Sequence, residues 1–112
     1  MDENRARELL AAERARVQES LEQIEAAATD EREAAIERGT DMSDPAAPLN
    51  EELTENAIAD GLRQRLSQIE RAEQRLAAGT YGRSVRSGQP IPDERLEADP
   101  AAELTFAEAD HL

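Results

Sequence analysis

The chain has 112 residues and no cysteine, and its formal net charge is −13, from 13 Lys and Arg against 26 Asp and Glu. Such an acidic chain is a poor binder of duplex DNA because contact with phosphates needs clustered cations, and without thiols it has no cysteine nucleophile and no cysteine zinc site. With one Phe, one Tyr and no Trp, the core must come mainly from Leu, Ile, Val and Ala, which favours paired helices in one small domain.

The beginning of the chain, MDENRARELL, is charged, and no stretch approaches the roughly 20 apolar residues that a membrane span needs. We therefore expect a cytoplasmic protein that does not contact a membrane. A basic protein partner, or a basic channel within one, fits the acidic surface, although acidity that serves solubility alone is the alternative.

A first helix is predicted from about Glu3 to Arg38. The residues between its apolar positions are Glu, Arg, Gln and Ala, which are good helix formers. The apolar positions follow a heptad-like seam that Arg14 and Glu31 interrupt. The seam consists of Leu10, Val17, Leu21, Ile24, Ala28 and Ala35.

A turn is predicted after the first helix, with Gly39 as the C-terminal cap and the segment Thr40 to Asn50 rich in Asp and Pro. A second helix then runs from about Glu51 to Ala78, with Gly61 and Glu73 as weak points in its stripe. That stripe holds Ile58, Leu62, Leu66, Ile69 and Leu76. Two such stripes joined by a short turn predict an antiparallel coiled-coil hairpin, and we expect a monomer.

The helical period stops at Gly79, and the density of Gly and Pro from Thr80 to Pro100 predicts a compact, turn-rich lobe. A lobe of this size normally needs a metal or a disulfide, and cysteine supplies neither here. The candidates for its small core are Tyr81, Val85, Ile91, Leu96, Leu104 and Phe106.

The run GTYGRSVRSGQPIPDERLEADPAAELTFAEAD resembles the four-cysteine zinc finger of the DksA/TraR family, whose pattern is G-T-Y-G-x-C-x-x-C-G-x-x-I-P-x-x-R-L-E-A-x-P followed by L-C-x-x-C. The four cysteine places are held by Ser84, Ser87, Thr105 and Glu108. The framework matches at Thr80, Tyr81, Gly82, Gly88, Ile91, Pro92, Arg95, Leu96, Glu97, Ala98, Pro100 and Leu104.

The resemblance implies an all-α protein with a coiled-coil hairpin at residues 1–79, its tip at about 39–50, and a zinc-finger-like lobe at residues 80–112. It implies a transcription regulator that binds RNA polymerase through the secondary channel, and no enzyme. Two Ser, one Thr and one Glu do not supply the thiolate or imidazole ligands that structural zinc needs, so we expect no metal and no other cofactor. Since the sequence ends at Leu112, the family's C-terminal helix is expected to be absent or reduced to a stub.

The resemblance also places a functional signature at the turn. An ungapped count back from Tyr81 puts Asp41, Asp44 and Ala46 on the family's D-x-x-D-x-A tip, which in the family acts near the polymerase active site. A stiff two-helix rod suits the delivery of carboxylates down a narrow cationic passage. The alternative is local: Asp44 before Pro45 is a common helix start, and Asp41 could cap a turn.

Basic residues of the lobe are a second candidate contact. Arg83, Arg86 and Arg95 could anchor the lobe on polymerase, although local pairing with Asp93, Glu94 and Glu97 is favoured. In the family, an alarmone, guanosine tetraphosphate, is bound by basic residues on the second helix. The same count places Gly61, Gln64 and Gln68 there, so alarmone binding is doubtful even with Arg63, Arg65 and Arg71 nearby.

Other functions have weaker support. His111 is the only His and lies beside the end of the sequence, where a catalytic role is improbable, and the many Glu residues fit a solvated helix face. A coiled-coil adaptor or oligomerisation protein with a degenerate lobe is the competing hypothesis. Binding to RNA polymerase distinguishes the two.

Overall fold

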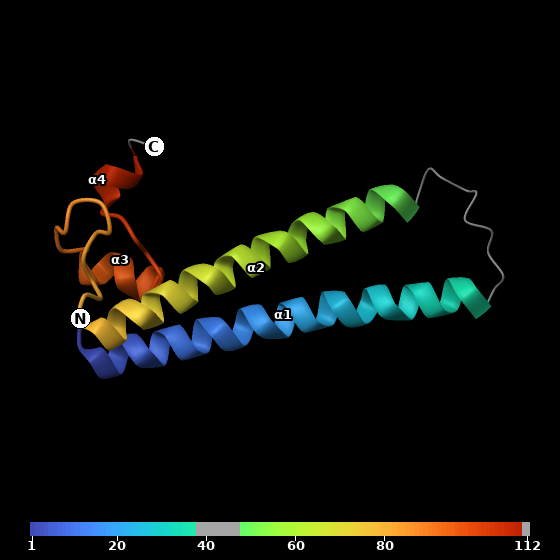
Figure 1. The fold of residues 1–112 in the computed structure, drawn as a ribbon, viewed down its shortest axis with the longest axis horizontal. Helices are drawn as coiled ribbons and strands as arrows, with labels where there is room; N and C mark the ends of the chain where they lie inside the picture. Colours follow the sequence, from blue (N-terminus) through green and yellow to red (C-terminus); the bar gives the residue numbers. More distant parts are fainter. Residues whose placement is uncertain (38–47, 111–112) are drawn as a thin grey trace.

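The computed structural model describes residues 1–37 and 48–110. Helix α1 (Glu3–Glu37) and helix α2 (Pro48–Ala78) lie side by side as an antiparallel hairpin, and the short helices α3 (Asp93–Ala98) and α4 (Phe106–Ala109) lie at the end where the N-terminus is (Figure 1). In the described part of the chain the only β-type pairing is an isolated bridge between Arg83 and Pro90. The predicted all-α hairpin with a small lobe is confirmed.

The hairpin is elongated, and its helices are well suited to that shape. The molecule measures 57 × 30 × 20 Å along its principal axes. Helix α1 has 35 residues, so at a rise of about 1.5 Å per residue it spans nearly the full length. Across residues 1–37 and 48–110, none of the helices is both long enough and apolar enough to pass through a bilayer.

The centre of the hairpin core lies near the lobe. Leu10 and Val17 of α1 and Ile69 and Ala72 of α2 are buried there, together with Ala101 from the lobe. Leu21, Ile24 and Ala28, the next residues of the predicted seam, are partly buried, whereas the side chain of Ala35 lies outside the described residues. Leu62, Leu66 and Leu76 pack against the core from α2, as the predicted stripe requires.

Two expectations about α2 were wrong. The helix begins at Pro48 rather than at Glu51, because proline fits a first helical position, where its missing N–H would have had no partner. Ile58 was placed on the seam but is 51% exposed, and Ala59 is buried in its stead. The seam therefore reaches back from Leu62 by three residues rather than four.

Helix α2 ends where the sequence predicted. Gly79 has φ of 79°, a left-handed conformation that costs glycine little. The backbone N–H of Gly79 donates to the carbonyl of Leu76 at 3.3 Å, and that of Thr80 donates to the carbonyl of Arg75 at 2.9 Å. This pair of bonds is the Schellman motif, which satisfies two carbonyls at the helix end and turns the chain into the lobe.

The lobe, residues 80–110, has a small core of its own. Ile91, Leu96 and Ala102 form it, and Met1 and Tyr81 pack against it. Leu104 is partly buried, but Val85 and Phe106, which were expected inside, are 56% and 50% exposed. The prediction was wrong for Val85 and Phe106 because Met1 and the small residue Ala102 complete the lobe core, and these two larger side chains stay at the surface.

Candidate functional site

The predicted tip residues Asp41, Asp44 and Ala46 lie outside the described residues, as do Gly39 and His111. The remaining candidate residues belong to the lobe and to α2. Their contacts define three groups: the positions that resemble zinc ligands, the arginines of the lobe, and the junction between the hairpin and the lobe.

The four positions that resemble zinc ligands are brought together by hydrogen bonds. The buried Ser84 donates from Oγ to Oε2 of Glu108 at 2.8 Å, and its Oγ accepts the backbone N–H groups of Arg86 and Ser87 at 3.1 and 3.2 Å. Thr105 caps α4 reciprocally with Glu108: the Thr105 N–H donates to Oε1 of Glu108 at 3.0 Å, and the Glu108 N–H donates to Oγ1 of Thr105 at 3.3 Å.

This cluster concentrates donors on one carboxylate. The Ser84 hydroxyl, followed by the Thr105 backbone, lowers the pKa of Glu108 to about 2, with smaller contributions from the Thr105 and Ser87 side chains. Within the described residues, no group of three or more His, Cys, Asp or Glu is arranged to hold a metal ion. The hydrogen bonds of Ser84, Thr105 and Glu108 link the loop at 84–87 to α4.

The lobe arginines do not pair as expected with Asp93, Glu94 and Glu97. Arg95 donates from Nε to the carbonyl of Leu104 at 2.8 Å, and its guanidinium lies 4.7 Å from the ring centroid of Phe106. Arg83 donates to the carbonyl of Gly88 at 3.2 Å, and the side chain of Arg86 is exposed. The local-pairing expectation was wrong: Asp93 and Glu97 contact the N-terminal end of the hairpin, and Glu94 is exposed.

Two acidic residues of α3, Asp93 and Glu97, contact Met1 and Arg5 at the N-terminal end of the hairpin instead. The nitrogen of Met1 lies 2.9 Å from Oδ1 of Asp93. Arg5 makes a two-pronged contact with Glu97, from Nε to Oε1 at 3.0 Å and from Nη2 to Oε2 at 2.8 Å. The Arg5 hydrogen bond lowers the pKa of Glu97.

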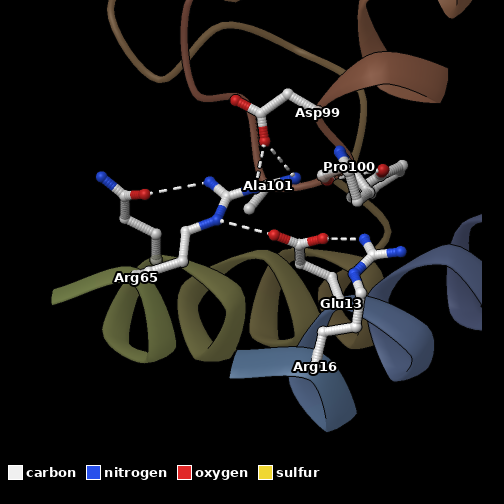
Figure 2. A network of polar contacts seen from close by, with 8 residues as sticks. Glu13, Arg16, Arg65, Asp99, Pro100 and Ala101 are labelled. Atoms are coloured by element: carbon white, nitrogen blue, oxygen red, sulfur yellow. Dashed lines mark hydrogen bonds and ion pairs between the residues drawn. The ribbon is translucent and has the colours of Figure 1, made fainter. Parts of the chain in front are cut away.

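On the other side of the lobe, Arg65 of α2 joins three parts of the molecule (Figure 2). Its Nε lies 3.3 Å from Oε1 of Glu13 in α1, and its Nη2 lies 2.6 Å from Oδ1 of Asp99 in the lobe. Its Nη1 donates to Oε1 of Gln68 at 3.0 Å. Burial opposes the charge of Arg65, but Asp99 and then Glu13 outweigh that cost, so the pKa of Arg65 is raised.

The other two arginines near the alarmone-related positions are also engaged. Arg63 pairs with Asp60 at 2.9 Å and with Glu25 at 3.3 Å, and Arg71 donates to Oε1 of Glu103 at 2.8 Å. Gly61 and Gln64 are exposed. A polyanion that approached this face would have to displace carboxylates from the arginines.

The junction itself consists of Arg65, Asp99, Ala101 and Ala102. Ala101 is buried in the hairpin core and its neighbour Ala102 in the lobe core, so consecutive side chains enter opposite cores. Tyr81 packs against both and donates from its hydroxyl to the carbonyl of Pro100 at 2.7 Å, and burial raises its pKa to about 12. Sequence reasoning missed this junction, although an Asp-Pro-Ala-Ala run of small residues after α3 is the signal that could have indicated a close approach.

The fold is DksA-like. It resembles the structure of the transcription factor DksA2 from Pseudomonas aeruginosa with a TM-score of 0.81 and 27% sequence identity, over 97% of this chain and 81% of that one. The chain is also 39% identical over 70 residues to General stress protein 16O of Bacillus subtilis (strain 168), a match that includes 62% of this chain and 43% of the relative's length. No protein-family model matches the sequence. The chain thus has a transcription-factor fold and sequence similarity to a stress protein.

Proposed function

We propose that this protein regulates transcription by binding RNA polymerase, with the hairpin inserted into the secondary channel and Asp41 and Asp44 acting near the active site. The observation that carries the proposal is the likeness to DksA2 over nearly the whole chain, hairpin and lobe together. A narrow hairpin with an acidic surface also fits a passage lined by cations. It acts by changing the stability of promoter complexes and catalyses no reaction itself.

In this proposal the two parts of the chain have different tasks. Residues 1–79 form the inserted hairpin, and residues 80–112 form a lobe that stays outside the channel. Arg83 and Arg86 are exposed and can contact the polymerase surface, whereas Arg95 holds the lobe together through Leu104 and Phe106. The lobe is metal-free, with Ser84, Ser87, Thr105 and Glu108 linked by hydrogen bonds in place of zinc ligation.

The test combines a binding assay with in-vitro transcription. Asp41→Asn with Asp44→Asn removes two charges while keeping side-chain size, so helix content and polymerase binding should persist and the effect on transcription should fall. Asn caps a helix about as well as Asp, so a purely local role predicts no change. The matched control is Asp30→Asn with Glu33→Gln, which removes two charges from exposed positions on α1.

The outcomes separate the hypotheses. Retained binding with a lost effect in the Asn pair, and a wild-type effect in the control, supports action by the tip. Equal activity of all three proteins would refute the tip hypothesis. Failure of the wild-type chain to bind polymerase at all would favour the coiled-coil adaptor, which sedimentation analysis would then test as an oligomer.

A further inference from the structure

The ion pairs between the hairpin and the lobe all have the same polarity. The cationic group comes from the hairpin and the carboxylate from the lobe in each ion pair described between them. On the α2 side, Arg65 meets Asp99, while Arg71 and Arg75 meet Glu103 at 2.8 and 3.8 Å. The orientation of the lobe is therefore set by polar contacts around a small apolar centre.

Arg65 lies on α2 and differs from the other cations in this set because it also contacts α1, the other helix of the hairpin. Its side chain is 24% exposed, against 50% for Arg5 and 51% for Arg71, while that of Arg75 is 16% exposed. It engages Glu13, Gln68 and Asp99 with separate nitrogens, and such charge-assisted bonds from a planar guanidinium fix direction as well as distance. Figure 2 shows the guanidinium between the two carboxylates.

Asp99 transmits this contact to the chain that follows it. The same Oδ1 atom that meets Arg65 also accepts the backbone N–H of Ala101 at 3.2 Å, and Ala101 is the residue that enters the hairpin core. The N–H of Asp99 donates to the carbonyl of Arg95 at 2.7 Å, which ties it to the end of α3. The carboxylate of Asp99 therefore connects α2 to the buried segment, and its backbone N–H connects that segment to α3.

We propose that Arg65 is a positioning residue that fixes the direction of the hairpin relative to the lobe. This deepens, and rests on, the proposed function: when the lobe is held on the polymerase surface, the direction of the hairpin decides where the tip lies. Two contacts made by one molecule strengthen its binding jointly only when the geometry allows both to form at the same time. Loss of Arg65 therefore uncouples the lobe from the tip without unfolding either part.

The first experiment uses the free protein. Since the chain has no cysteine, spin labels can be attached at Glu22→Cys on α1 and Glu94→Cys on α3, both exposed positions. The distance distribution measured by pulsed electron paramagnetic resonance should broaden in Arg65→Met. Arg63→Met is the matched control, because Arg63 pairs with Asp60 and Glu25 and not with the lobe. A distribution as narrow as in the control would overturn the proposal.

Arg65→Lys keeps the charge and loses the planar fork, so it should give an intermediate width. It also keeps the test decisive if Arg65→Met fails to fold, since a lysine variant with the wild-type width would equally refute a positioning role. Melting temperatures should be alike for Arg65→Lys and Arg63→Met, which separates positioning from general stabilisation.

The second experiment measures transcription. The maximal effect of Arg65→Met at saturation should fall, and the half-maximal concentration should rise by about tenfold, as expected when one of two linked contacts loses its alignment. Arg65→Lys should recover part of both, and Arg63→Met should match wild type. A broadened distribution with unchanged transcription would refute the coupling. If the wild type fails to act on polymerase, the proposed function fails, while the distance measurement still decides the role of Arg65.

Discussion

The half of the hairpin beside the lobe and the half away from it carry similar apolar stripes but bury them to different extents. Beside the lobe, Leu10, Val17 and Ile69 are at most 7% exposed. In the other half, Ala59 is the buried residue among the side chains described, while Ile36 and Ile58 are 79% and 51% exposed. The periodicity alone does not distinguish the two halves.

The lobe accounts for the difference. Ala101 of the lobe joins the core of the near half, whereas among the described residues the far half is formed by α1 and α2 alone. Between those helices a groove of about 310 Å³ is lined by Ser20, Gln23, Ile24, Ala27 and Glu55, of which Ile24 is the one large apolar side chain. Local opening follows low burial, so the far half should open before the near half.

The largest expected effect tests the near half directly. Ile69→Ala should lower the free energy of unfolding by about 3 to 4 kcal/mol, because Ile69 is fully buried and its truncation leaves a cavity. Ile58→Ala in the far half should cost less than about 1 kcal/mol. Urea denaturation followed by circular dichroism measures both, and equal losses would mean that the two halves are packed alike.

A somewhat smaller effect is expected for the lobe. Leu96 is fully buried with Ile91 and Ala102, so Leu96→Ala should cost about 2 to 3 kcal/mol. Val85→Ala on the exposed side of the lobe is the control and should stay within about 0.5 kcal/mol. A loss below about 0.5 kcal/mol for Leu96→Ala would indicate a loosely held lobe. Unfolding curves from the single tyrosine, Tyr81, report on this region.

A smaller difference is expected between two ion pairs that cross the hairpin. Arg14 and Glu73 pair with side chains that are 30% and 40% exposed, and Arg63 and Glu25 pair farther from the lobe with 52% and 55% exposed. After allowance for solvent screening, a double-mutant cycle should give about 0.5 kcal/mol for the first pair and close to zero for the second. A larger coupling in the second pair would contradict the burial difference.

These ion pairs also indicate how far the fold could be predicted. The stripes of α1 and α2 predicted the hairpin because heptad spacing leaves little choice of partner. Arg14 and Glu73 were noted only as breaks in separate stripes, yet they meet across the hairpin. Which break faces which depends on the register between the helices, and single-helix periodicity contains no such information.

The site was less predictable than the fold. The resemblance placed Ser84, Ser87, Thr105 and Glu108 at related positions, but zinc chemistry predicts no hydrogen-bond pattern for such a set. Arg65 was noted only as a neighbour of the alarmone-related positions. Its role depends on Asp99, 34 residues away in the sequence, and on a contact that exists only once the lobe has folded back.

Acid should weaken the hydrogen bonds that the Glu108 carboxylate accepts from Ser84 and Thr105, and this is the smallest expected effect. Because the folded pKa is lowered from 4.5 to about 2, the contribution of Glu108 to stability is present above about pH 4.5 and is lost as the pH falls towards 2. Arg16 also lowers the pKa of Glu13, and Arg5 lowers the pKa of Glu97, so several carboxylates contribute to the acid unfolding of the wild type.

Glu108→Gln keeps the shape of the side chain but cannot titrate. The difference between its acid unfolding curve and that of the wild type therefore isolates the contribution of this carboxylate. The variant should be less stable at pH 7, and the gap should close between pH 4.5 and 2, while a metal chelator should leave both proteins unchanged. A stability difference that persists at pH 2 would contradict the role of this carboxylate. Destabilisation of the wild type by a chelator would contradict a metal-free lobe.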